Sequence, residues 1–442
     1  MSPPVDAVKS DDKLPATVDA VIIGGGIIGC VAAYNLAKKG HTVAVVEKGR
    51  VGGEQSSRNW GWCRQTGRDT REIPLVREAL TFWDGLNQQL GAETGFRRSG
   101  LLYVTKDEAQ LARWERWVDQ ARQYQVHTRL LNTAEVQAMT PGCEEKWVGG
   151  LHTPSDGRAE PSKAAPAIAE AARKLGVTFH QNCAARGLET EGGAVSAVVT
   201  EKGAIRARAV LCAAGAWSSL FCRRHGFDLP QLSVLASVMR TGPAPEIGDA
   251  PVSAPNFGFR RRLDGGYTVG LRGHAIFHLT PDAFRYLQAF WPAYRQERNG
   301  IKVKFGRAFF EGLQVPRHWA LDQVSPFERT RVLDPVPDHG VLETAFTNFK
   351  AAYPAMRDAK IVETWAGMIE TVPDAIPVIS PIDGLPGLYL ATGFSGHGFG
   401  IAPAAGRLAA DLIAGDPPIV DPQPFRYSRM IDGTKLLPQT GL

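Results

Sequence analysis

A glycine-rich turn near the N-terminus limits the folds open to this chain more than any other feature. A mostly apolar run, residues 18–23, leads into the sequence GGGIIG at residues 24–29, and a helical stretch follows. Gly24 permits a tight turn out of the strand, Gly26 lets the backbone approach a pyrophosphate, and Gly29 lets the helix pack closely on the sheet. This order predicts the first βαβ unit of a parallel sheet that binds a dinucleotide.

The segment after this helix supports a nucleotide site. Residues 42–47 (TVAVVE) are typical of a second buried strand, and that strand ends at Glu47. A carboxylate roughly 20 residues after the glycines accepts hydrogen bonds from ribose hydroxyls and repels a 2′-phosphate. An ordinary βαβ turn is the alternative, because a lone GxGxxG motif is weak evidence in a chain with 47 glycines.

A polar loop with two tryptophans follows. Residues 52–65 (GGEQSSRNWGWCRQ) offer small hydroxyls and arginines that can bind the oxygens in the middle of a long cofactor. A surface loop pinned by Trp60 and Trp62 is the alternative. The cofactor contacts expected in this first part of the chain are Gly24, Gly26, Ile27, Ile28, Gly29, Glu47, Lys48, Ser56, Ser57, Arg58, Asn59 and Trp60.

Length and composition exclude several classes of protein. A chain of 442 residues is too long for one core and predicts two interleaved domains. No apolar run approaches the roughly 18 residues of a membrane helix, and residues 1–17 lack the apolar stretch of a signal peptide, so we expect a cytoplasmic protein. The six cysteines form no CxxC pair, which argues against a metal site. The small basic excess is dispersed, which argues against nucleic acid binding.

Three later segments, taken with the glycine turn, resemble a flavoprotein family. Residues 209–217 (AVLCAAGAW), 365–374 (WAGMIETVPD) and 393–398 (GFSGHG) are similar to family segments that return to the cofactor. With Glu47 and the sequence SSRN at residues 56–59, they resemble the FAD-dependent D-amino-acid oxidase, glycine oxidase and sarcosine oxidase family over about residues 18–412. The further cofactor contacts that this resemblance implies are Ala184, Ala214, Gly215, Trp217, Gly367, Gly393, Phe394, Ser395, Gly396, His397 and Gly398.

The resemblance implies an α/β (α+β overall) fold in which a Rossmann-like FAD-binding domain is interleaved with an antiparallel-sheet substrate domain. We expect the FAD-binding domain at residues 18–95, 151–230 and 359–420, and the substrate domain at residues 96–150 and 231–358. A flexible N-terminus (1–17) and a C-terminal tail (421–442) flank them. A helical insert at about residues 278–320 is longer than is usual in the family. The sequence leaves three roles open for this insert: it could cap the pocket, join the subunits of a homo-oligomer or rest on a membrane.

The implied reaction is oxidation of the C–N bond of an amino acid or N-substituted amino acid. A hydride passes to flavin N5, the imine is hydrolysed in water, and oxygen accepts the electrons. An arginine forked onto the substrate carboxylate would place the C–H bond in a dry pocket. Strand alternation puts Arg260 and Arg262 on the same face of one strand. The alternation does not decide whether this face or the opposite face lines the pocket. The residues expected to act on the substrate are Arg64, Arg260, Arg272 and His397, with Arg262 a further candidate.

Two departures from sarcosine-oxidase-like members qualify this expectation. Those members attach the flavin through a cysteine near the position of Gly367, so FAD is expected to be non-covalent here. They also carry a lysine where Gly400 stands.

A helix over residues 401–414 would stabilise the anion formed on flavin reduction. The alternatives are a dehydrogenase that passes electrons to a quinone or carrier, and a flavin-binding subunit without its own substrate.

Overall fold

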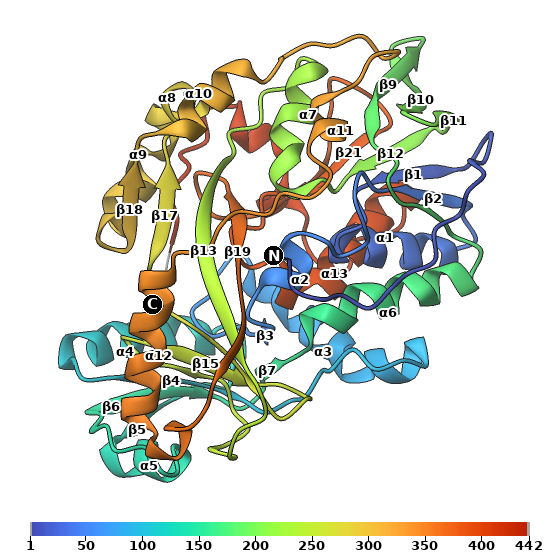
Figure 1. Ribbon diagram of the computed structural model, residues 1–442. Helices are drawn as coiled ribbons and strands as arrows, with labels where there is room; N and C mark the ends of the chain where they lie inside the picture. The colour runs from blue at the N-terminus through green and yellow to red at the C-terminus, as the bar shows by residue number, and fades with distance from the viewer. Residues whose placement is uncertain (1, 440–442) are drawn as a thin grey trace.

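A six-stranded sheet carries the glycine turn in one half of the molecule (Figure 1). The computed structural model describes residues 2–439. Five strands run parallel and β20 pairs antiparallel with β21. In spatial order the strands are β20 (Val378–Pro381), β21 (Leu388–Thr392), β12 (Ala209–Cys212), β1 (Ala20–Ile23), β2 (Val43–Val46) and β8 (Thr178–His180). The central strands β1 and β2 are fully buried, as expected for a parallel sheet covered on both faces.

Different layers cover the two faces of this sheet. One face packs against the helices α1 (Ile27–Lys38), α6 (Pro161–Lys174) and α13 (Gly398–Ala414), and α3 (Ile73–Leu90) packs on α13 in the same core. The other face packs against α7 (Ser218–Arg224) and a three-stranded sheet of β9 (Ala185–Glu191), β10 (Ala194–Thr200) and β11 (Gly203–Arg206). The α3, α6 and α13 helices come from distant parts of the chain, so this half of the molecule is assembled from several segments.

A ten-stranded sheet forms the other half. Its order is β18-β17-β13-β16-β15-β14-β4-β6-β5, with β19 paired to β13. The β14–β4 and β17–β18 pairs are parallel, so the expected antiparallel sheet is in fact mixed. Its strands are β4 (Leu101–Thr105), β5 (Arg129–Asn132), β6 (Gly149–Thr153), β13 (Leu232–Thr241), β14 (Val252–Ser253), β15 (Gly258–Arg261), β16 (Tyr267–Gly270), β17 (Ala275–His278), β18 (Ile301–Lys304) and β19 (Ile361–Thr371).

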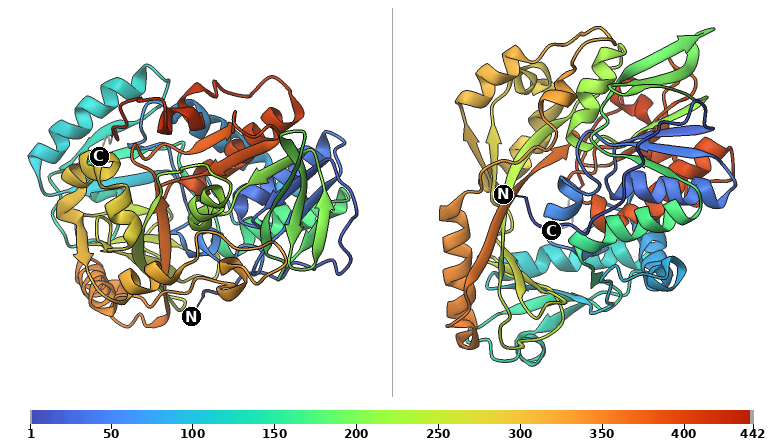
Figure 2. Two further views of the ribbon diagram at one scale, coloured as in Figure 1. Left: turned by 90° about the horizontal axis from the view of Figure 1, so that it is seen from above. Right: turned by 45° about the vertical axis from the view of Figure 1, so that its right-hand side comes forward.

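Helices cover this sheet as well. The α12 helix (His339–Ala352) packs an aromatic cluster that includes Phe259, Tyr267 and Phe349, and Figure 2 shows it along the outer side. The α4 helix (Glu108–Arg122) packs near β4 and β6 at the other end. The remaining short elements are α2 (Gln55–Arg58), β3 (Trp62–Cys63), α5 (Thr133–Met139), β7 (Gly157–Arg158) and α11 (Pro326–Arg329).

The long strands β13 and β19 pair along almost their whole length and connect the two halves (Figure 1). Their register places Val234 opposite Ile369 and Ala236 opposite Gly367. The β19 strand was expected within the FAD-binding domain, but it belongs to the large sheet. The expected boundary at residue 150 also falls inside β6, which pairs within the large sheet. Strand pairing, which a local sequence pattern does not reveal, decides both boundaries.

The insert, residues 278–320, follows β17 and consists mainly of helices. They are α8 (Pro281–Arg285), α9 (Leu287–Glu297) and α10 (Arg307–Gln314), and β18 pairs in parallel with β17. Phe284, Trp291, Phe305 and Phe310 are exposed on it. Across residues 2–439, no helix is both long enough and apolar enough to cross a bilayer.

The N-terminal segment differs from the expected flexible lead-in. The Asp6 N–H donates to Ser162 O at 3.0 Å, the Asp11 N–H donates to Phe179 O at 2.7 Å, and Val8 is buried. The two backbone bonds dock this segment against α6 and β8. The polar, proline-containing sequence predicted a flexible segment. The docking could not be predicted, because its partners α6 and β8 lie far along the chain.

Candidate active site

One cavity of about 670 Å³ is lined by residues of both halves of the molecule. We call the part lined by segments 23–28, 46–59 and 213–217 the nucleotide arm. We call the part lined by segments 232–238, 271–277, 290–301 and 367–372, with Arg64, Arg68 and Pro438, the substrate arm. The volume is in the range of cofactor and ligand sites, and residues 394–400 line the same cavity.

The glycine turn of the nucleotide arm has the geometry that its spacing predicts. Gly24 has φ +111°, and a Cβ there would lie 2.4 Å from Ala213 O. A Cβ on Gly29 would lie 2.1 Å from Gly24 O, so helix α1 can approach the sheet this closely only with glycine. Gly26 caps α1, and no acidic residue stands in the first turn of this helix. The turn therefore fits a pyrophosphate at a helix N-terminus.

Glu47 lies where the ribose is expected. Its Oε2 accepts from the Gly25 N–H at 2.7 Å and its Oε1 accepts from the Gly49 N–H at 2.7 Å. Burial raises the pKa of Glu47, and these two donors oppose the shift without cancelling it. The carboxyl thus also braces the backbone of the glycine turn, a contact that its sequence position did not predict.

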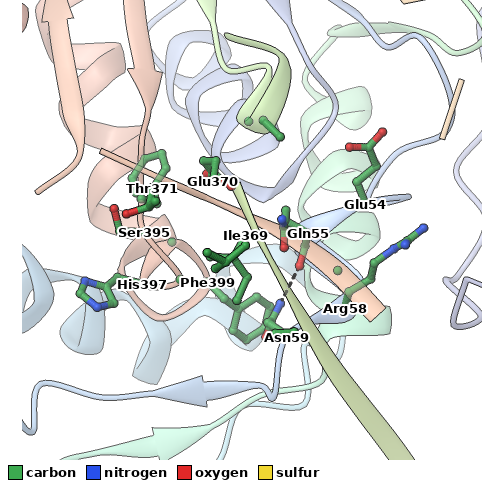
Figure 3. Close-up of a pocket in the computed structure, with 18 of the residues that line it drawn as sticks. Glu54, Gln55, Arg58, Asn59, Ile369, Glu370, Thr371, Ser395, His397 and Phe399 are labelled. Atoms are coloured by element: carbon green, nitrogen blue, oxygen red, sulfur yellow. Dashed lines mark hydrogen bonds between the residues drawn. The ribbon is translucent and has the colours of Figure 1, made fainter. Parts of the chain in front are cut away.

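The loop after β2 forms the short helix α2 at the middle of the cavity (Figure 3). Ser56 Oγ accepts from the Ile27 N–H at 2.8 Å, which joins this loop to α1. Asn59 Nδ2 donates to Gln55 O at 3.1 Å, and Arg58 donates to Ala366 O at 2.8 Å. Ser57 is buried but does not line the cavity. The other expected contacts from residues 24–60 line it, except Gly29, which packs behind the turn.

The later cofactor segments also converge on the cavity. Lys48 Nζ lies 2.7 Å from Glu54 Oε1 and 4.3 Å from the centre of a Trp217 ring. Trp217 Nε1 donates to Glu54 at 3.2 Å. Ala184 is buried behind the wall, where its N–H donates to Glu201, and the neighbouring Ala185 lines the cavity instead. Ala214, Gly215, Trp217, Gly367, Phe394, Ser395, Gly396, His397 and Gly398 line the cavity, whereas Gly393 does not.

Helix α13 begins at Gly398, three residues before the predicted start at residue 401. His397 is its N-cap residue, so the helix N-terminus opens directly into the cavity. Figure 3 shows His397 and Ser395 on one side of the cavity and Arg58 on the other. Amide groups at this end can stabilise negative charge that develops on a bound group.

His397 is paired with Glu72, a residue that the sequence did not single out. Its Nδ1 lies 3.0 Å from Glu72 Oε2. Burial, and next the nearby Arg68, lower the pKa of His397. Burial raises the pKa of Glu72, but His397, Arg68 and Arg64 outweigh this effect and the net pKa is lowered. Neutral His397 therefore donates from Nδ1 to ionised Glu72 and presents an acceptor at Nε2.

Three arginines gather in the substrate arm. The guanidinium carbons of Arg64 and Arg272 lie 5.9 Å and 4.9 Å from the Tyr103 ring centre. Arg68 is 3 % exposed, and its NH1 group has no hydrogen-bond partner within residues 2–439. Burial and the neighbouring Arg64 lower the pKa of Arg68 to about 9, so it remains charged at neutral pH. Arg64 and Arg272 were expected here, whereas Arg68 and Tyr103 were missed.

The structure corrects the expectation for Arg260 and Arg262. Arg260 is 1 % exposed and lies 2.7 Å from Glu160, and Arg262 pairs with Asp264 at 3.1 Å. Neither residue lines the cavity. The face of β15 that carries Arg260 packs against the Trp60 backbone, where its Nε donates at 2.6 Å.

The remaining wall is mostly apolar, and the insert contributes to it. Phe290 and Tyr294 of α9 line the cavity with Val234 of β13 and Ile369 of β19. The insert thus forms part of the wall of the substrate arm. Four carboxyl groups line the cavity, those of Glu47, Glu54, Glu297 and Glu370, and burial raises the pKa of Glu370 to about 7. Among residues 2–439, no three His, Cys, Asp or Glu side chains gather in a way that could hold a metal ion.

The chain is similar to several known proteins. An L-amino acid deaminase from Proteus myxofaciens has a TM-score of 0.93 and 33% identity, covering 97% of this chain and 98% of that one. A glycine oxidase from Pseudomonas aeruginosa is 26% identical over 420 residues, 92% of this chain and 97% of its own length. The mitochondrial dimethylglycine dehydrogenase of Mus musculus is 24% identical over 422 residues, and the chain spans 44% of its length.

The DAO family, described as FAD dependent oxidoreductase, matches residues 19–412. That range contains the glycine turn, Glu47, the α2 loop and the loop at the start of α13, and their geometry fits FAD. The chain belongs to the DAO family of FAD-dependent oxidoreductases.

Proposed function

We propose that this enzyme oxidises the C–N bond of an amino acid or N-substituted amino acid, with non-covalent FAD, and that the substrate carboxylate binds between Arg64 and Arg272. The observation that carries the proposal is that both guanidinium groups line the cavity that also holds the glycine turn and both lie near the buried Tyr103 ring behind its wall. Arginine binds a carboxylate with two parallel hydrogen bonds, which fixes both position and orientation.

The buried Arg68 supports an anionic ligand. The guanidinium groups of Arg64, Arg68 and Arg272 lie in the substrate arm, which Glu297 and Glu370 also line, and Glu72 and Asp156 lie near Arg68. Arg68 is 3 % exposed, and its NH1 group has no hydrogen-bond partner among residues 2–439. A buried charge needs a partner, and an α-carboxylate would supply it.

The other cavity residues would orient the reacting bond. Bound FAD supplies the two-electron acceptor for this chemistry. His397 Nε2 would accept a hydrogen bond from the substrate amino group, and Glu72 holds the ring in that tautomer. Val234, Ile369 and Phe290 would exclude water around the C–H bond. None of the cavity-lining residues within 2–439 is a cysteine, which agrees with non-covalent FAD.

The relatives' names support the substrate class. The Proteus myxofaciens protein is an L-amino acid deaminase solved with anthranilate, an aromatic carboxylate. The Pseudomonas aeruginosa relative is a glycine oxidase, so it too is named for an amino acid substrate. Tyr294 and Phe290 in the wall of the substrate arm favour an apolar side chain in the substrate of this chain.

An anaerobic titration tests the proposal. The purified holoenzyme is mixed with D- and L-amino acids, N-methyl amino acids and simple amines, and the flavin absorbance is followed. We expect bleaching by amino acids and none by the matching amines, which lack the carboxylate. Equal bleaching by an amino acid and its decarboxylated amine would contradict carboxylate binding, and no bleaching at all would favour a subunit without its own substrate.

A dehydrogenase that reduces a quinone is the second candidate. The exposed Phe284, Trp291, Phe305 and Phe310 give the insert an apolar outer surface, which would suit a lipophilic acceptor. Rapid quinone reduction with slow oxygen use would support the dehydrogenase.

The insert could also join the subunits of a homo-oligomer, which would appear as a larger species in solution scattering.

A further inference from the structure

The described C-terminal tail returns to the cavity after leaving the body of the protein. Residues 431–435 are exposed, Leu436 and Leu437 are half-buried, Pro438 is buried, and Gln439 is exposed again. Pro438 lines the cavity that holds Arg64 and Arg68. Pro438 is thus the one buried residue of segment 431–439, which indicates a specific docking position.

Two hydrogen bonds fix the backbone on either side of Pro438. An Arg71 NH2 group donates to Leu437 O at 3.0 Å, and the Gln439 N–H donates to Asp69 Oδ2 at 3.2 Å. Arg71 is itself held by Asp69, at 2.9 Å and 2.7 Å. The pair Asp69–Arg71 lies in the segment that also supplies Arg64, Arg68 and Glu72 to the site, so the tail docks on the segment that carries the charged end of the cavity.

The base of the tail is anchored separately. Arg429 is 3 % exposed and its Nε lies 3.0 Å from Asp374 Oδ2. Between this anchor and Leu436 the chain is exposed, and its side-chain bonds, such as Thr434 with Asp432, are largely local. A segment with few buried contacts opens at low cost compared with global unfolding. Proline has no N–H group, so Pro438 can sit in the wall without burying an unpaired donor.

We infer that residues 436–439 are an openable part of the cavity wall that determines which substrates the enzyme accepts. This inference rests on the proposed amino-acid oxidation. When docked, Pro438 closes the substrate arm beside the segment of Arg64 and Arg68, excludes solvent and limits the size of the substrate that the arm can hold. When the two hydrogen bonds with Asp69 and Arg71 break, the wall opens.

The test compares two shortened holoenzymes, one ending at Lys435 and one ending at Gln439. The second keeps Pro438 and both flanking bonds and is the matched control. For the chain ending at Lys435, iodide quenching of the flavin fluorescence is expected to rise roughly threefold, because the cavity is no longer closed to solvent ions. The ratio of kcat/KM for tryptophan to that for alanine is expected to rise by about tenfold, because a larger side chain then fits.

Unchanged quenching and an unchanged substrate ratio in the Lys435 chain would overturn the inference, as would equal changes in both chains. If neither chain oxidises any amino acid, the proposed function fails, whereas iodide quenching still tests the wall. Should the Lys435 chain lose its flavin, Pro438→Gly and Pro438→Val replace it in the full-length enzyme. Both variants add the same backbone N–H group and differ in whether a side chain fills the wall. We then expect more quenching for glycine than for valine, and equal quenching in both variants would contradict the role of Pro438.

Discussion

The nucleotide arm and the substrate arm of one cavity are built from different materials. Backbone at Gly24, Gly26 and the start of α1 forms much of the nucleotide arm, and close contacts such as Gly29 with Gly24 leave no room for a side chain. Side chains from strands, the insert and the C-terminal tail form the substrate arm. Cofactor binding should therefore be sensitive to any side chain added at the glycine turn. Substrate choice should instead depend on the identity of the side chains that line the substrate arm.

The largest effect is expected at the glycine turn. In Gly24→Val the new side chain would begin 2.4 Å from Ala213 O at a positive φ, so the turn cannot form and FAD binding should be lost. The ratio of flavin to protein absorbance measures this directly. Gly85→Ala, in the middle of α3, is the matched control and should keep its flavin. A yellow Gly24→Val protein would break the distinction between the two arms.

Arg260 tests whether an arginine outside the cavity acts on stability alone. Arg260→Met leaves Glu160 buried without its partner, which should lower the free energy of unfolding by about 3–5 kcal/mol. Arg261→Met removes a more exposed pair with Glu246 and should cost less than about 1 kcal/mol. Urea unfolding measures both values. A changed substrate preference in folded Arg260→Met would show that this residue serves the site after all.

Arg272 tests the substrate arm itself. Arg272→Met should keep its flavin and its stability but lower kcat/KM for amino acids by about 30- to 100-fold, since a hydrogen bond to a charged group contributes roughly 2–3 kcal/mol. Arg262→Met, which lies outside the cavity, should change kcat/KM by less than about twofold. Equal losses in the two variants would mean that the carboxylate does not bind at Arg272.

Glu370 should give the smallest effect, and only at high pH. Its pKa is raised to about 7 by burial, from an ordinary value of 4.5, so the folded enzyme binds more protons than the unfolded chain between these pH values. Stability therefore falls as pH rises through this window, and Glu370→Gln should remove part of that loss. The full shift corresponds to about 3 kcal/mol, and water in the cavity should reduce it to about 1–2 kcal/mol.

Thermal unfolding of the two holoenzymes at pH 5 and pH 8 checks this expectation. The variant and the wild type should melt together at the lower pH, because the carboxyl is then largely protonated. Glu370→Thr is a control that removes the acid and changes the volume. A constant difference between Glu370→Gln and the wild type at both pH values would rule out titration of Glu370 as the cause.

The nucleotide arm could be predicted from the sequence because its main contacts are local. The glycine turn, Glu47 and Ser56 lie within one short stretch, and each has a geometric reason for its residue type. The start of α13 was placed three residues late, since nothing in GFSGHGFG marks where a loop becomes a helix.

Much of the substrate arm could not be predicted, because tertiary contacts decide it. Glu72 and His397 are 325 positions apart, and no pattern in the sequence joins them. Arg260 and Arg272 look equivalent in a basic hairpin, and only the packing of β15 shows that the first is buried in an ion pair. Arg68 and Pro438 carry no motif and become notable only through burial beside the cavity.

The strand order of the parallel sheet has a consequence for synthesis. The β1 strand lies between β2 and β12, and β12 in turn pairs with β21, so the sheet joins the beginning of the chain to its end. At typical translation speeds of about 5–20 residues per second, the ribosome needs roughly 10–40 s to proceed from Ile23 to Ala209 and roughly 20–70 s to proceed from Ile23 to Leu388. The nascent β1–β2 pair therefore has an uncovered apolar edge until β12 emerges, and β12 in turn has one until β21 emerges, so a chaperone would shield these edges in the meantime.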